Sequence, residues 1–192
     1  VDARLDEIEK TIGYRRFDVV CVFNGTGDIM AKSSALHKLF SRSSSIEEVA
    51  TFFNNSKSEC LEIYETPFDS EERLLALVKN LAFNRLVMRK IEVCRILREL
   101  CSSSRLIKLF LHWSCIVDRN DAKRALRNIP MNKLQNIEVV NQPKLDDDLL
   151  LYIVNNISTS ANIESRFTTI TTGGLRNVFE IISRDDRPRT IT

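Results

Sequence analysis

The side chains with the most reactive chemistry in this sequence are five cysteines and two histidines. They are Cys21, Cys60, Cys94, Cys101 and Cys115, with His37 and His112. The cysteines form no Cys-x-x-Cys pair and have few nitrogen partners, so their spacing does not predict a structural zinc site. Their odd number argues against a disulfide framework. We therefore expect reduced, buried thiols, no metal or other cofactor, and an intracellular protein of the cytoplasm or nucleus.

Two short segments could support enzymatic chemistry. Gly25-Thr26-Gly27-Asp28 follows an apolar, strand-like run and would cradle a phosphate if a helix began directly after it. It lacks the glycine spacing of a dinucleotide-binding fingerprint and the Gly-Lys-Ser/Thr of a P-loop. His112 could act as a base, but no motif ties it to a nucleophile and an orienting carboxylate. We therefore predict that the protein is not an enzyme, and rank a nucleotide-binding enzyme last.

A cluster of basic residues provides a different kind of chemistry. Within 24 residues the sequence contains Arg85, Arg89, Lys90, Arg95, Arg98, Arg105 and Lys108, offset only by Glu92 and Glu99. Such a patch can bind the phosphates of RNA, each contact adding a salt-dependent increment of affinity. Aromatic residues that would stack on bases are sparse in this window. An RNA- or ribonucleoprotein-binding module using the Arg85–Lys108 cluster is therefore the second hypothesis for function.

The elements that position these residues are those of a globular chain. Its 192 residues are 43% hydrophobic and 28% charged, with a net charge of +2, which indicates one domain or a small pair and no strong bias toward a partner of either charge. No apolar stretch is long enough to span a bilayer, so no membrane association is expected. Strand-like and helix-like patterns alternate. We expect helices over residues 28–40, 46–53, 70–82, 92–101, 119–126, 147–157 and 175–182.

Two neighbouring stretches share the same apolar spacing at relative positions 1, 4 and 6. They are Leu106, Leu109 and Leu111 in the first stretch, and Leu134, Ile137 and Val139 in the second. Position 1 recurs at Ser58, Phe83, Leu106, Leu134 and Ile163, which lie 25, 23, 28 and 29 residues apart. A helix-like segment follows each stretch, and Asp118 and Asp146 stand where two of these helices should begin.

This arrangement resembles the leucine-rich-repeat superfamily, particularly the helix-bearing kind in ribonuclease-inhibitor-like and F-box-associated proteins. The resemblance covers about residues 16–182. It implies an α/β fold, a leucine-rich-repeat-like solenoid of about five or six irregular strand–helix units. An N-terminal capping helix over residues 1–15 and a polar tail over residues 183–192 would flank it. No F-box precedes the repeats, since Leu5–Leu39 lacks the Leu-Pro opening and the later Trp of that module, so a ubiquitin-ligase role rests on analogy alone.

In such a solenoid the strands line one concave face, and alternate side chains point toward a partner. The side chains expected there are Tyr64, Arg85, Val87, Arg89, Lys108, Phe110, His112, Glu138 and Val140. Aromatic and arginine side chains are common anchors of protein interfaces. Trp113 is instead expected to be buried at the strand end. The leading hypothesis is a non-enzymatic protein–protein interaction adaptor or scaffold, possibly a subunit or substrate-recognition part of a larger protein complex. No motif specifies its partner or oligomeric state.

Overall fold

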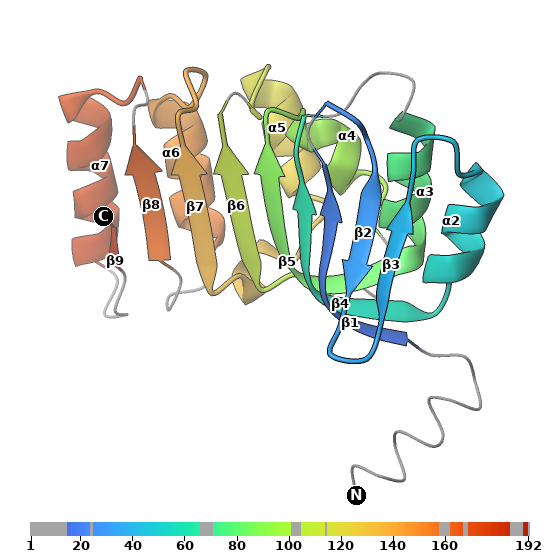
Figure 1. The fold of residues 1–192 in the computed structure, drawn as a ribbon. Helices are drawn as coiled ribbons and strands as arrows, with labels where there is room; N and C mark the ends of the chain where they lie inside the picture. The colour runs from blue at the N-terminus through green and yellow to red at the C-terminus, as the bar shows by residue number, and fades with distance from the viewer. Residues whose placement is uncertain are drawn as a thin grey trace, which may run out of the picture. The chain divides into compact units, whose positions relative to one another are not determined.

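The computed structural model describes residues 15–23, 25–65, 71–100, 105–113, 115–157, 162–166, 169–184 and 190–191. The chain divides into two compact units. Unit 1 is Val1–Arg85 with Glu99–Arg105, and unit 2 is Leu86–Arg98 with Leu106–Thr192. Both units combine strands and helices, which confirms the predicted α/β class (Figure 1). The expected N-terminal helix lies outside the described residues, apart from Arg15, which begins the first strand.

Unit 1 contains a mixed sheet in which the strands are ordered β3-β2-β1-β4. These strands are β1 (Arg15–Val22), β2 (Ile29–Lys32), β3 (His37–Phe40) and β4 (Ser56–Ile63). β1 pairs in parallel with β4, whereas β2 pairs antiparallel with both β1 and β3. The helices α2 (Ile46–Phe53) and α3 (Glu71–Asn80) lie on one face of these strands (Figure 1).

The helix predicted over residues 28–40 is wrong, because this segment is the β2–β3 hairpin. Ile29 and Ala31 are buried, while the alternate residues Met30 and Lys32 are more exposed. A period of two residues is that of a strand rather than of a helix. The turn preceding β2 is tight, with Gly25 and Gly27 both at positive φ (75° and 68°). A strand therefore follows the Gly25–Asp28 turn, and the helix that a phosphate-binding loop would need is absent there.

Two kinds of contact hold the helices of unit 1 against this sheet. Phe17, Phe40, Phe52 and Phe53 bring their rings together at centroid separations between 4.9 and 5.8 Å, and such aromatic clusters bury large apolar area. Arg73 of α3 is buried, and its guanidinium donates to the main-chain carbonyls of Ser41 and Gly27. These bonds satisfy a buried charged group, so the turn before β2 and the loop after β3 are fixed to α3.

Strand β5 (Leu81–Arg89) contributes Leu81–Arg85 to unit 1 and Leu86–Arg89 to unit 2. The predicted helix of residues 70–82 therefore ends at Asn80, two residues early. The remaining elements of unit 2 follow in strict strand–helix alternation. They are α4 (Val93–Leu97), β6 (Lys108–His112), α5 (Arg119–Leu126), the 3-10 turn η2 (Met131–Lys133), β7 (Asn136–Val140), α6 (Asp147–Asn156), β8 (Asn162–Arg166), α7 (Thr172–Ser183) and β9 (Thr190–Ile191).

In unit 2 the strands β6, β7, β8 and β9 pair in sequence order, and every pair is parallel. Parallel neighbours need a crossover connection, and the helices α5, α6 and α7 provide it. These helices and α4 lie on one face of the strands, and no described helix of unit 2 covers the other face (Figure 1). Residues 190–191 of the predicted polar tail form β9, while residues 185–189 and 192 lie outside the described part of the chain.

The apolar positions identified from the repeat spacing form the core of unit 2. Leu106, Leu109, Leu111, Leu134, Ile137 and Val139 are each at most 2% exposed. The intervening residues Phe110, His112, Glu138 and Val140 are half-buried on the face without helices. This alternation confirms which side chains of β6 and β7 point toward the helices and which point away.

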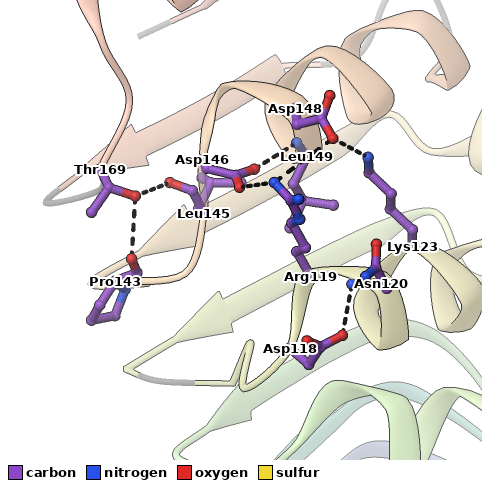
Figure 2. A network of polar contacts seen from close by, with 10 residues as sticks. All are labelled: Asp118, Arg119, Asn120, Lys123, Pro143, Leu145, Asp146, Asp148, Leu149 and Thr169. Carbon is purple, nitrogen blue, oxygen red and sulfur yellow. Dashed lines mark hydrogen bonds and ion pairs between the residues drawn. The ribbon is translucent and has the colours of Figure 1, made fainter.

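The N-termini of α5 and α6 are joined by a network of charged side chains (Figure 2). As predicted, Asp118 and Asp146 are N-caps, and each accepts hydrogen bonds from main-chain N–H groups in the first turn of its helix. Arg119 of α5 also donates to Asp146 at 2.9 Å, and Lys123 donates to Asp148 at 2.9 Å. The Asp146 carboxylate thus caps α6 and also binds α5, the preceding helix.

A second carboxylate joins α6 to α7. Asp147 accepts hydrogen bonds from the main-chain N–H and the hydroxyl of Thr171, at 2.8 and 2.5 Å. Thr171 is the N-cap of α7, and its oxygen accepts from the N–H of Gly174 at 3.0 Å. The helix therefore begins at Thr172, three residues before the start predicted at Leu175. A Cβ added at Gly174 would lie only 2.0 Å from an Asp147 oxygen, so the two residues are packed in direct contact.

This packing predicts opposite effects of alanine at two adjacent glycines. Gly174→Ala should lower the free energy of unfolding by about 1–2 kcal/mol, because the Asp147 carboxylate must give up its hydrogen bonds to Thr171 to make room for the new Cβ. Gly173→Ala should raise it by about 0.5–1 kcal/mol, because the nearest side-chain atom is 3.5 Å from the new Cβ and alanine favours the helix. Urea denaturation followed by circular dichroism measures both. Equal effects of the two changes would contradict the assigned contact.

The capping carboxylates also predict a loss of stability in acid. The pKa values of Asp118 and Asp146 lie below the ordinary 3.8; partial desolvation raises the pKa of Asp146, but the hydrogen bonds from Leu149 and Arg119 outweigh it. Their stabilisation is therefore complete above about pH 4 and is lost as the pH falls through the lowered pKa values. Between pH 6 and pH 3, Asp146→Asn should lose less stability than the wild type, by roughly 0.3–1 kcal/mol, since asparagine caps without titrating.

Glu47→Gln is the control for this measurement, since the exposed Glu47 lies on α2 and takes no part in this network. Its unfolding midpoints at the two pH values should follow those of the wild type. If Asp146→Asn and the wild type lost the same stability, the acid sensitivity would have another origin.

Candidate partner-binding surface

The nine residues predicted to face a partner divide between the two units. Tyr64 and Arg85 belong to unit 1, and the other seven belong to unit 2. The hydroxyl of Tyr64 is half-buried and donates to Glu62 at 3.2 Å, while Arg85 is exposed. The sequence-based set is therefore divided between the two units, and several of its members contact one another within unit 2.

Val87 is a correction to the predicted surface, because it is only 3% exposed. Leu86 and Met88 on either side of it are fully buried as well. A strand with both faces covered shows a continuous apolar run rather than alternation. The period-two rule used to place Val87 on an open face does not hold in this part of β5.

Four of the predicted residues meet on the helix-free face of β6 and β7, and we call them the sheet-face cluster: Phe110, His112, Glu138 and Val140. Parallel pairing sets Phe110 beside Glu138 and His112 beside Val140. The rings of Phe110 and His112 form an edge contact with 6.3 Å between centroids. His112 Nε2 lies 3.0 Å from Glu138 Oε1, with the two side chains 17% and 20% exposed. Lys108, one step along β6, is exposed.

The His112–Glu138 contact is a close approach rather than an aligned hydrogen bond, because Nε2 has no partner in hydrogen-bonding geometry among the described residues. The nearest described thiol also does not complete the pair as a nucleophile. The nearby Cys115 thiol donates to the main-chain carbonyl of His112 at 3.2 Å and not to its ring, and burial raises the pKa of this thiol. A thiol held protonated is a poor nucleophile. The His112–Glu138 pair is therefore suited to forming part of a polar surface of fixed shape.

Trp113 lies next to this cluster, and the prediction that it is buried is wrong. Its side chain is 40% exposed, and its backbone is left-handed, with φ at 57°. The guanidinium of Arg89 lies over the indole, 5.3 Å from the ring centroid, and the His112 ring contacts it at 5.8 Å. An indole and a guanidinium in this arrangement attract each other through the ring quadrupole. Trp113 and Arg89 thus extend the sheet-face cluster with an aromatic and cationic pair.

The left-handed backbone conformation of Trp113 recurs after three strands. Lys90, Trp113 and Asn141 directly follow β5, β6 and β7, and their φ angles are 54°, 57° and 54°. Main-chain bonds connect these positions: Lys90 N–H donates to Trp113 O at 3.1 Å, and Trp113 N–H donates to Val140 O at 2.9 Å. Asparagine tolerates this conformation, whereas a bulky residue in it is a genuine outlier.

Gln142 is a positioning residue that the sequence reasoning missed. It is fully buried; its side-chain oxygen accepts from Ile116 N–H at 2.9 Å and its amide donates to Val140 O at 3.3 Å. Counting Leu134 as position 1 of the repeat spacing places Gln142 at position 9. The repeat count at this second stretch was the signal that could have found it. Gln142 fixes the turn after β7 to the segment after β6.

The members of the predicted basic cluster divide between the two units. Arg85 and Arg105 belong to unit 1. Within unit 2, Arg95 lies on α4 and pairs with Glu92 at 3.3 Å. Arg98 is the C-cap of α4, while Arg89, Lys90 and Lys108 lie on or beside the strands. The basic residues relevant to the helix-free face of unit 2 are therefore three of the predicted seven.

The described residues contain one group with metal-ligand side chains, Glu92, Cys94 and Asp121, whose ligand atoms lie within 4.8 Å of one another. Both carboxylates already pair with arginines, Glu92 with Arg95 and Asp121 with Arg124. The Cys94 thiol donates to Glu92, and burial followed by this carboxylate raises its pKa to about 11. A metal ligand must be a thiolate, so the group fits a hydrogen-bonded thiol better than a metal site. Cys21, Cys60 and Cys115 are likewise buried and stand outside any disulfide among the described residues, while Cys101 lies outside the described residues.

No family model, no curated protein and no solved structure matches this chain. In the described part of the chain, no helix has the length and apolar character needed to cross a membrane. The geometry of unit 2 is therefore the basis for a functional conclusion.

The left-handed conformation of Trp113 predicts that, at this position, a glycine variant is more stable than an alanine variant, the reverse of the usual order. Trp113→Gly should be more stable than Trp113→Ala by about 1 kcal/mol, because alanine pays the cost of a positive φ and glycine does not. At Lys108, an exposed position inside β6, the order should be the usual one, with alanine more stable than glycine. Chemical denaturation of the four variants tests this. The same order at both positions would show that Trp113 is not held in the left-handed region.

Proposed function

We propose that this protein is a non-enzymatic interaction module whose unit 2 presents the helix-free face of its strands to a protein partner. The finer architecture that we propose is a leucine-rich-repeat-like stack of strand–helix units. Three features of unit 2 support it: the strands pair in parallel and in sequence order, the helices share one face (Figure 1), and Gln142 binds the turning backbone at position 9. Stacked repeats of this kind use their strand face for binding.

The observation that carries the proposal is the sheet-face cluster with its neighbour Trp113. Aromatic, histidine and charged side chains contact one another on a face that no described helix of unit 2 covers. Their partial burial limits the rotamer freedom that binding would remove. Aromatic and arginine side chains in such a setting are the usual anchors of an interface. The module would serve as an adaptor, as a subunit, or as the substrate-recognition part of a larger complex.

RNA binding is the competing proposal, and Arg89, Lys90 and Lys108 support it because they carry positive charge on or beside the same strands. The remaining members of the predicted basic cluster lie in unit 1 or belong to α4. A phosphate-binding surface needs several such charges along one track. We therefore rank a protein partner first.

A pull-down from cell extract with quantitative mass spectrometry tests the proposal. The Phe110→Ala variant should lose a partner that the wild type retains, by about tenfold or more, and ribonuclease should leave the result unchanged. Phe179→Ala is the matched control, because this ring is 60% exposed on helix α7 and its removal should not affect the partner. Partners that disappear with ribonuclease but survive Phe110→Ala would favour RNA and contradict the proposal.

A further inference from the structure

We infer that Trp113 and Arg89 form a recognition site for an acidic segment of the protein partner, in which a carboxylate side chain stands next to an apolar or aromatic one. This inference rests on the proposed function and specifies the partner's chemistry. It is argued from the backbone at Trp113, from the charges around it and from the rings beside it.

The backbone at Trp113 is the first argument. The equivalent position after β7 is Asn141, which accepts a positive φ readily, and the position after β5 is Lys90. A tryptophan in this conformation is strained, and strained residues persist mainly at functional sites. The left-handed turn holds the indole partly outside the core, where it is 40% exposed. The same turn after β7 forms with the smaller Asn141, so the left-handed turn does not itself require an indole.

The charges around the indole are the second argument, and they favour an acidic ligand. The Arg89 guanidinium lies over the ring at 5.3 Å. Lys90 is exposed, and its N–H donates to the carbonyls of both His112 and Trp113 at 3.1 Å, which places this lysine beside the tryptophan. The nearby carboxylate on the same face, Glu138, lies 3.0 Å from His112. Among the described residues, the cations Arg89 and Lys90 therefore stand beside the indole, and complementary charge favours a carboxylate-bearing partner.

The chemistry of the pair indicates a peptide side chain rather than an isolated anion. A guanidinium stacked on an aromatic ring can still donate from its edge to a carboxylate in a forked geometry. The indole provides apolar area for the residue next to that carboxylate, and the Phe110 and His112 rings continue this apolar surface along β6. A carboxylate followed by a leucine or phenylalanine satisfies both parts of the site at once.

Trp113 makes the test direct, because it is the single tryptophan of the chain and its fluorescence reports on the site alone. A phage-displayed library of random 12-residue peptides is selected on the wild-type protein at about 150 mM salt, an ionic strength that screens weak surface attraction. The recovered peptides are synthesised and titrated into the protein. We expect them to be enriched in Asp or Glu beside Leu or Phe, and to shift the Trp113 emission on binding.

Two variants and a control decide the outcome. Arg89→Gln and Trp113→Gly should each weaken binding of these peptides tenfold or more, and circular dichroism melting establishes that each variant is folded. Arg176→Gln removes an exposed arginine from α7 and should leave the affinity unchanged. Arg89→Gln does not alter the left-handed position, so it keeps the test valid if the glycine variant unfolds.

The results that would overturn the inference are equally specific. It fails if the library yields no binder, if the binders lack acidic residues, or if binding neither shifts the Trp113 emission nor responds to Arg89→Gln. It also fails if a poly-uridylate oligonucleotide displaces the peptides and binds more tightly than they do. Binders that ignore these two changes but lose affinity in Phe110→Ala would leave the proposed function standing, whereas binders indifferent to all three variants would remove both.

Discussion

The turn that ends each parallel strand is the constraint on which the rest of unit 2 depends. A parallel neighbour can be reached only after the chain leaves the sheet, forms a crossover and returns. The left-handed residue after β5, β6 and β7 makes this departure sharp, and main-chain bonds between adjacent turns keep the departures in line. The buried Gln142 adds side-chain bonds at the same level. Each strand–helix unit can then pack on the next in the same relative position.

The helices that begin shortly after these turns are fixed by carboxylates rather than by backbone conformation. Asp146 and Asp147 are adjacent in sequence, yet one binds the preceding helix and the other binds the N-cap of the following helix. The positive end of each helix dipole offsets the clustering of negative charge there. In unit 2, neutral hydrogen bonds therefore stabilise the turns where the strands end, and charged side chains stabilise the places where the helices begin.

The sequence predicts the parts of this structure that depend on local patterns. Alternating apolar residues identify the buried side of β6 and β7, and the aspartates identify the starts of α5 and α6, because the relevant physics involves only neighbouring residues. The hairpin over residues 28–40 escapes prediction, since its strands of four residues are too short to establish a period. Val87 and Trp113 were misplaced for another reason. Burial on both faces of β5 and a positive φ without glycine are decided by tertiary contacts that no local pattern records.

The β2–β3 hairpin of unit 1 has a consequence for how the protein avoids self-association. In unit 1 it places β3 at the outer side of the β3-β2-β1-β4 order, so β1 is covered by an antiparallel neighbour instead of standing at that edge. β3 has only four residues and carries His37 and Lys38, and short, charged strands are poor templates for pairing with another chain. The long, apolar β1 is thereby kept inside the sheet. The β2–β3 hairpin therefore disfavours edge-to-edge pairing with another chain, in addition to completing the sheet of unit 1.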